Sequence, residues 1–143
     1  MSSSNVPIRL LVDSGFWLAL YDSTDPWHEQ AAANGELVED YPLLVPWPVL
    51  YETVKTRIVK RPAFASFERV LKRNSTWLLD DSPYREACLD DAFSSGGRPL
   101  SLVDLVLRRM LEDTALRIDG LLTINPKDFV DVCSRRRIEI VQM

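Results

Sequence analysis

Five polar residues either directly follow a short apolar run of the chain or lie in the first helical turns after one, and four of the five are acids. They are Asp13, Glu52, Asp104, Asn125 and Asp128. Carboxylates brought together repel one another and raise each other's pKa values unless a cation lies between them. Oxygen ligands without histidine or cysteine favour Mg²⁺ or Mn²⁺ over zinc. The chemistry that such a cluster predicts is metal-assisted hydrolysis of a phosphodiester.

Each acid also has a purely structural interpretation. Asp13 suits the N-cap of a following helix, and Glu52 suits an exposed position in an early helical turn, where the helix dipole favours an acid. Ser101 and Asp104 have the spacing of a reciprocal capping box, and Arg108, four residues further on, is placed for a helical ion pair with Asp104. Only the position of all these residues at strand ends or helix starts favours a common site.

Apolar runs alternate along the chain with helical patterns. The runs predict strands at 8–12, 43–45, 76–79, 120–124 and 138–141. The helical patterns lie at 16–21, at 27–40, from Pro48 through Leu50, Val54 and Ile58, from Phe64 onward, at 84–93 and from Ser101 to about Leu116, with a loop at 94–99. Short buried strands that alternate with helices predict a mainly parallel sheet of four or five strands, covered on both faces. We therefore expect a three-layer α/β/α fold.

The length of 143 residues predicts a single domain that spans 1–143. In an open parallel sheet, ligands bind beyond the carboxyl ends of the strands, where the chain order reverses. The strand-end acids are therefore expected to meet at one edge of the sheet.

The composition is that of a folded globular protein, with 46% hydrophobic and 27% charged residues. No apolar run reaches the roughly 18 residues of a membrane-spanning helix, and the first residues lack a signal-peptide pattern, so we expect a cytoplasmic protein. The chain has two cysteines, Cys88 and Cys133, and one histidine, His28. These numbers exclude a disulfide framework and a Cys/His zinc site.

Positive charge is concentrated in the middle of the chain. The net charge is −4, yet residues 53–79 hold seven basic residues and one acid, which leaves 10 basic and 20 acidic residues elsewhere. A basic segment on an acidic body is typical of contact with a polyanion. A solvated helix face explains the same pattern equally well.

Four short motifs in order resemble the PIN-domain ribonucleases, and in particular the VapC type of toxin. They are Leu11-Val12-Asp13-Ser14-Gly15, Leu50-Tyr51-Glu52-Thr53, Ser101-Leu102-Val103-Asp104 and Leu121-Leu122-Thr123-Ile124-Asn125-Pro126-Lys127-Asp128-Phe129. The resemblance implies that Asp13, Glu52 and Asp104 hold Mg²⁺ or Mn²⁺. Many members of the family carry an aspartate where this chain has Asn125, so either Asn125 or Asp128 is the fourth ligand. As a structural alternative, residues 125–128 fit the start of a helix, with Asn125 as its N-cap.

The resemblance implies a metal-dependent endoribonuclease that leaves 5′-phosphate and 3′-hydroxyl ends. Its catalytic residues would be Asp13, Glu52, Asp104 and Asp128. We expect Lys55, Arg57, Lys60 and Arg61 to hold the RNA backbone, or alternatively a partner protein. The family likeness further implies a small cognate antitoxin and a homodimer. The sequence does not name the RNA target.

Two other functions fit parts of the pattern. A PIN-like module without catalysis, serving as an RNA-binding or assembly scaffold, is supported by Asn125 in place of an acid. A phosphoacceptor receiver domain also has acids at strand ends, but it needs two adjacent acids after the first strand and a lysine after the last. The segments 13–15 and 138–143 lack both features.

Overall fold

The chain forms a five-stranded sheet in which every pair of neighbouring strands is parallel. A computed structural model describes residues 8–94 and 99–143, so most of the expected loop at 94–99 lies outside the described residues. The strands are β1 (Leu10–Val12), β2 (Leu43–Pro46), β3 (Thr76–Leu79), β4 (Gly120–Leu122) and β5 (Glu139–Ile140), in the spatial order β3-β2-β1-β4-β5. The predicted parallel sheet is thus confirmed, with five strands.

The three central strands are short and completely buried, as their continuous apolar sequences predict. In the register, Leu11 of β1 pairs with Leu44 of β2 on one side and with Leu121 of β4 on the other. The edge strand β3 is less covered, and Trp77 and Leu78 are exposed. The chain order reverses between β1 and β4, which makes this pair the switch point of the sheet.

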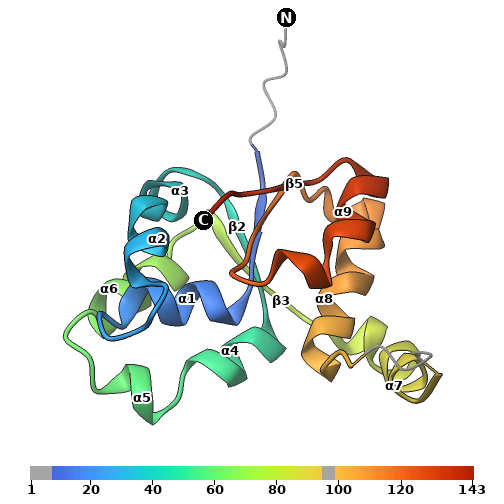
Figure 1. The fold of residues 1–143 in the computed structure, drawn as a ribbon, viewed down its shortest axis with the longest axis horizontal. Coiled ribbons are helices and arrows are strands. Elements are labelled where there is room, and N and C mark those ends of the chain that lie inside the picture. The colour runs from blue at the N-terminus through green and yellow to red at the C-terminus, as the bar shows by residue number, and fades with distance from the viewer. Residues whose placement is uncertain (1–7, 95–98) are drawn as a thin grey trace, which may run out of the picture.

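Helices cover both faces of the sheet (Figure 1). Those described are α1 (Ser14–Tyr21), α2 (His28–Ala33), α3 (Gly35–Asp40), α4 (Trp47–Thr53), α5 (Thr56–Val59), α6 (Phe64–Leu71), α7 (Arg85–Ser94), α8 (Leu102–Glu112) and α9 (Val130–Arg136), with single 3₁₀ turns η1 (Ser82–Tyr84), η2 (Thr114–Leu116) and η3 (Pro126–Asp128). Helices α1 to α6 lie on one side, and α7, α8 and α9 lie on the other. This is the expected three-layer α/β/α architecture.

Two of the long helices expected from the sequence are each divided in two. The segment 27–40 forms α2 and α3, and Asn34 lies between them as the C-cap of one and the N-cap of the other. The helix expected from Pro48 through Ile58 ends at Thr53, and Lys55 is extended before α5 begins. Consecutive β-branched residues around this break are weak helix formers. Val54, expected on a buried stripe, is 43% exposed.

The helix expected from Ser101 to about Leu116 is shorter than predicted. It ends at Glu112, and the carboxylate of Asp113 accepts a hydrogen bond from the backbone N–H of Ala115, which starts the separate turn η2. An aspartate that bonds to the backbone two residues further on favours a turn over a continuing helix.

The main core surrounds the sheet on both faces, with Leu107 and Val132 on the α8 and α9 side and a group of aromatic rings on the α1 side. The ring of Trp17 lies 5.0 Å from that of Phe67 and 6.0 Å from that of Tyr21, measured between centroids. A smaller core between α7 and α8 contains Cys88 and Met110. Among the described residues, no helix has both the length and the apolar character needed to cross a membrane.

Candidate functional site

Asp13 lies at the carboxyl end of β1, at the switch point of the sheet. It is the N-cap of α1, and its Oδ1 accepts a hydrogen bond of 2.7 Å from the backbone N–H of Ser14. Its Oδ2 accepts a hydrogen bond of 3.0 Å from the hydroxyl of Thr123, which directly follows β4. The capping role is therefore real, and it also fixes the carboxylate between two strand ends.

Gly15 keeps this turn close to the end of β4. A Cβ atom at this position would lie only 2.8 Å from Cγ1 of Ile124, which is closer than side-chain carbon atoms approach. Glycine at position 15 therefore allows the first turn of α1 to pack against the residue that follows Thr123.

Ser14 connects Asp13 to the second acid, Glu52. The hydroxyl of Ser14 donates a hydrogen bond of 2.7 Å to Oε1 of Glu52 on α4. The same hydroxyl lies 3.5 Å from Oδ1 of Asp13. Glu52 is half-buried, so the interpretation of it as a solvated surface residue does not describe its surroundings.

Asp104 forms the reciprocal cap that its spacing predicts. The hydroxyl of Ser101 accepts a hydrogen bond of 3.1 Å from the backbone N–H of Asp104, and the carboxylate of Asp104 accepts hydrogen bonds from Ser101 in return. The expected helical ion pair between Asp104 and Arg108 is absent among the described residues, because Arg108 binds Asp131 of α9 instead. Asp104 is thus held by a cap and has no cationic partner within 8–94 and 99–143.

Pairwise repulsion links the four acids. The pKa of Asp13 is raised to about 6, chiefly by burial; the hydrogen bonds from Ser14 and Thr123 oppose the rise, and the negative charges of Asp104 and Glu52 add to it. Burial also raises the pKa of Asp104, with added repulsion from Asp128 and Glu52. Ser14 links Asp13, which follows β1, to Glu52, which lies on the helix after β2, and the meeting of all four acids at one edge of the sheet stays a prediction.

The donor atoms of this cluster suit a hard divalent cation, since carboxylates and hydroxyls are oxygen ligands and no ion pair to these acids is found within the described ranges. The spacing is wider than in a closed metal site. No three of the described histidine, cysteine, aspartate and glutamate side chains are close enough to hold one ion together. The carboxylates therefore lie near one another without forming a coordination shell.

The segment after β4 distinguishes the two candidates for the fourth ligand. Asn125 is exposed, and its backbone N–H donates a hydrogen bond to the hydroxyl of Thr123. Asp128 is half-buried on η3, and its charge raises the pKa of Asp104. The position of Asp128 therefore favours it over Asn125.

The four basic residues expected to contact RNA fall into two groups. Arg57 contacts Asp22 at 2.7 Å and Asp25 at 2.7 Å, and Arg61 lies 3.2 Å from Asp22. Lys55 and Lys60 are exposed at the two ends of α5, and neither forms an ion pair with another residue of the described ranges. The arginines thus hold α5 against the loop after α1, while RNA contact by all four residues stays a prediction.

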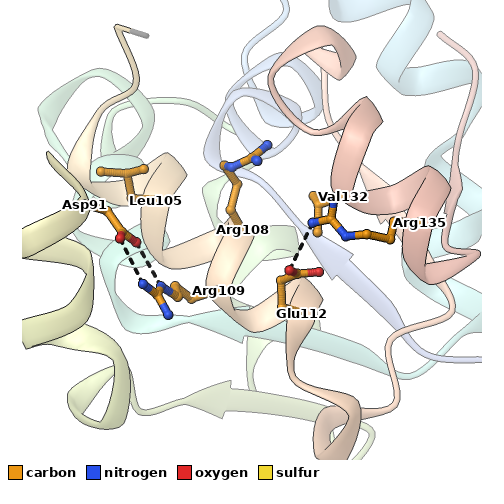
Figure 2. A pocket seen from close by; sticks show the side chains of 7 residues that line it. All are labelled: Asp91, Leu105, Arg108, Arg109, Glu112, Val132 and Arg135. Atoms are coloured by element: carbon orange, nitrogen blue, oxygen red, sulfur yellow. Dashed lines mark hydrogen bonds and ion pairs between the residues drawn. The ribbon is translucent and has the colours of Figure 1, made fainter. Parts of the chain in front are cut away.

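A pocket of about 230 Å³ lies elsewhere, between α7, α8 and α9 (Figure 2). It is lined by Asp91, Leu105, Arg108, Arg109, Glu112, Val132 and Arg135. Arg109 binds both carboxylate oxygens of Asp91 at 2.8 Å, and Arg135 binds Glu112 at 3.0 Å. None of the four site acids lines this pocket, so it is separate from the candidate site.

The sequence gives no signal for two of the contacts around the acids. The bond from Ser14 to Glu52 joins residues 38 positions apart, and the pair between Arg108 and Asp131 joins residues 23 positions apart. Local spacing cannot reveal either contact, because each depends on how separate helices pack.

Comparisons with known proteins agree with this architecture. No protein-family profile matches the sequence, and no curated protein matches it either. By structure, the chain is similar to VapC20 of Mycobacterium tuberculosis, a toxin that cleaves the sarcin-ricin loop. The TM-score is 0.65 at 16% identity, over 85% of this chain and 94% of that chain. The fold is therefore a VapC-like PIN fold.

Proposed function

We propose that this protein is a divalent-metal-dependent endoribonuclease and the toxin of a toxin–antitoxin pair. The observation that carries the proposal is Asp13, a buried carboxylate at the switch point of the sheet that is influenced by the charges of Asp104 and Glu52 and has no cationic partner among residues 8–94 and 99–143. An uncompensated buried charge is costly, so its retention favours a role in binding a cation. The likeness of the fold to VapC20 supports the same activity.

In this proposal Asp13, Glu52, Asp104 and Asp128 hold Mg²⁺ or Mn²⁺. The bound ion supplies an acidified water and neutralises the charge that builds up on the phosphodiester. Ser14 and Thr123 orient the carboxylates of Glu52 and Asp13 through their hydroxyl groups. Attack of water on phosphorus breaks the bond to the 3′ oxygen, which leaves a 3′-hydroxyl and a 5′-phosphate.

Lys55 and Lys60 are our candidates for direct contact with the RNA backbone, because both are exposed and free of acidic partners within the described ranges. Arg57 and Arg61 contribute positive charge to the same surface while they hold Asp22. A structured RNA loop is the first substrate class to test, since VapC20 cleaves the sarcin-ricin loop. A small cognate antitoxin, a homodimer and a cytoplasmic location complete the proposal.

The test is cleavage of an end-labelled sarcin-ricin loop RNA and of total RNA by the purified chain, with Mn²⁺ or with EDTA. We expect the wild type to cleave RNA with Mn²⁺ but not with EDTA. The cleavage rate with Mn²⁺ should fall at least about 100-fold in Asp13→Asn and Asp104→Asn. Asp40→Asn is the matched control, because it removes one carboxylate from an exposed position just before β2, at the opposite end of the strands. Cleavage that persists in EDTA or in Asp13→Asn would contradict the proposal.

A PIN-like module that binds RNA without cleaving it is the second candidate function. It is favoured by the wide spacing of the acids and by Asn125 in the last motif. The same assay separates the two functions, since this module retains RNA in a binding measurement but leaves it intact at every Mn²⁺ concentration.

A further inference from the structure

Arg108 lies one helical turn after Asp104 on α8, but its guanidinium group contacts the neighbouring helix α9 and the turn η3 before it. Its Nη1 and Nη2 donate to the two carboxylate oxygens of Asp131 at 2.7 and 2.8 Å. Nη1 also donates to the backbone carbonyl oxygen of Asp128 at 2.8 Å. In Figure 2, Arg108 and Arg109 leave α8 in different directions, with Arg109 turned toward Asp91. Arg108 therefore joins the helix that carries Asp104 to the turn that carries Asp128.

The Arg108 side chain is more enclosed than the other arginines that form ion pairs in this region, although its partner Asp131 is 43% exposed. The side chain of Arg108 is 19% exposed, whereas that of Arg135, which also links α8 to α9, is 56% exposed. A guanidinium group that binds both oxygens of a carboxylate is fixed in distance and in orientation. The third hydrogen bond extends this fixed geometry to the backbone of Asp128.

We propose that Arg108 is a positioning residue that sets the placement of Asp128 relative to Asp104, so that both carboxylates can serve one divalent cation. This inference rests on the proposed function. Arg108 touches neither acid's carboxylate, so it acts through the turn η3 and takes no part in the reaction itself. Groups that hold a metal ligand in place from outside the coordination shell tune metal affinity.

The pair between Arg135 and Glu112 supplies a matched control. Glu112 lies four residues after Arg108 on α8, and Arg135 lies four residues after Asp131, so both ion pairs join the same two helices. Of these two arginines, only Arg108 donates a hydrogen bond to the backbone carbonyl oxygen of Asp128 in the described part of the chain. A purely structural link between α8 and α9 would be weakened by substitution of either arginine.

The experiment is calorimetric titration of MnCl₂ into the full-length wild type, Arg108→Gln, Arg108→Lys and Arg135→Gln. We expect Arg108→Gln to bind Mn²⁺ about 10-fold more weakly or worse, and Arg135→Gln to bind within about 2-fold of the wild type. Arg108→Lys keeps the charge but cannot bridge three oxygen atoms in the same way, so its affinity falls between these two. It also serves as the test variant if Arg108→Gln fails to fold.

Hydrogen exchange at the backbone amides of residues 125–129 gives a readout that does not depend on the metal. We expect faster exchange there in Arg108→Gln and unchanged exchange in Arg135→Gln. Wild-type Mn²⁺ affinity in both Arg108 variants, or equal weakening in Arg108→Gln and Arg135→Gln, overturns the inference. A wild type that binds no Mn²⁺ overturns the proposed function instead, so the two failures are distinguishable.

Discussion

Helix α1 has a buried aspartate at each end, and the two acids are in opposite electrostatic situations. Asp13 is the N-cap and is 6% exposed, while Asp22 is the C-cap and is 0% exposed. The helix dipole favours negative charge at the N-terminus and disfavours it at the C-terminus, so the dipole alone predicts the lower pKa for Asp13. The reverse is found, because the pKa of Asp13 is raised to about 6 and that of Asp22 is lowered.

The partners of the two acids account for this reversal. The hydroxyl of Thr24 donates to Asp22 at 2.7 Å and lowers its pKa most, and Arg57 and Arg61 lower it further. Asp13 accepts hydrogen bonds from Ser14 and Thr123 but has no cationic partner in the described part of the chain. An acid that stabilises the fold is compensated by nearby arginines, whereas an acid kept without a cation among other acids is suited to binding one.

The largest expected effect on stability follows from removal of Asp22, the aspartate at the C-terminal end of α1 that pairs with arginines. Asp22→Ala should lower the free energy of unfolding by roughly 3 kcal/mol, because it removes hydrogen bonds to a buried charge and leaves Arg57 and Arg61 without that partner. Guanidinium denaturation measures the change. Glu68→Ala is the control, since the exposed pair of Glu68 with Lys72 should contribute less than about 1 kcal/mol. Equal losses in the two variants would show that Asp22 is not a structural acid.

The pH dependence of stability sharpens the same contrast. The folded-state pKa of Asp22 lies below its ordinary value of 3.8, so its stabilising contribution is present above pH 3.8 and is lost as the pH falls toward the lowered pKa. The difference in unfolding free energy between the wild type and Asp22→Asn should therefore stay constant between about pH 5 and about pH 7 and shrink in more acidic solution. Denaturation curves at a series of pH values measure it, and a constant difference down to about pH 2 would contradict the assignment.

A smaller effect of opposite sign is expected at the other end of α1. Asp13→Asn should raise the free energy of unfolding by about 1 to 2 kcal/mol in EDTA, because it removes a buried charge next to other acids. Asparagine also keeps the N-cap bond to Ser14. With Mn²⁺ present, the wild type should gain stability and the variant should not. A variant that is less stable than the wild type in EDTA would indicate that the carboxylate is compensated.

The smallest effects compare the two threonine donors. Thr123→Val and Thr24→Val each remove a hydroxyl that donates to one of these aspartates, and each should cost about 1 kcal/mol of stability. Only Thr123→Val should also weaken Mn²⁺ binding, by a few-fold, because its hydroxyl orients the carboxylate of Asp13. Calorimetric titration and denaturation of both variants test this. Weaker Mn²⁺ binding in Thr24→Val would contradict the assignment of Asp13, rather than Asp22, to the metal site.

The sequence was sufficient to predict the parts of the fold that depend on local patterns. Continuous apolar runs gave the buried parallel strands, and the spacing of Ser101 and Asp104 gave the capping box. The expectation that the acids converge came from the rule that the carboxyl ends of parallel strands share one edge, and the Ser14 link between Asp13 and Glu52 agrees with it. The sequence did not predict that two long helices are each divided in two. The break before Lys55, for example, depends on several weak helix propensities acting together.

The contacts that were missed join distant segments. Arg108 is spaced for a bond to Asp104, yet the packing of α9 across α8 brings Asp131 to it instead. The basic residues Arg57 and Arg61 were expected to contact RNA, but both form ion pairs with Asp22, which lies 35 positions before Arg57. In both cases a charged side chain had two potential partners, and only the tertiary arrangement decides between them.

The place of β1 between β2 and β4 has a consequence for protein synthesis. Thr123, which donates a hydrogen bond to Asp13, is made 110 positions after it, and Asp128 comes later still. A growing chain that has not reached β4 has one exposed edge on β1 and an incomplete set of acids. Any activity that depends on these acids therefore requires that the ribosome has passed Asp128, and a chain terminated before β4 lacks both Thr123 and Asp128.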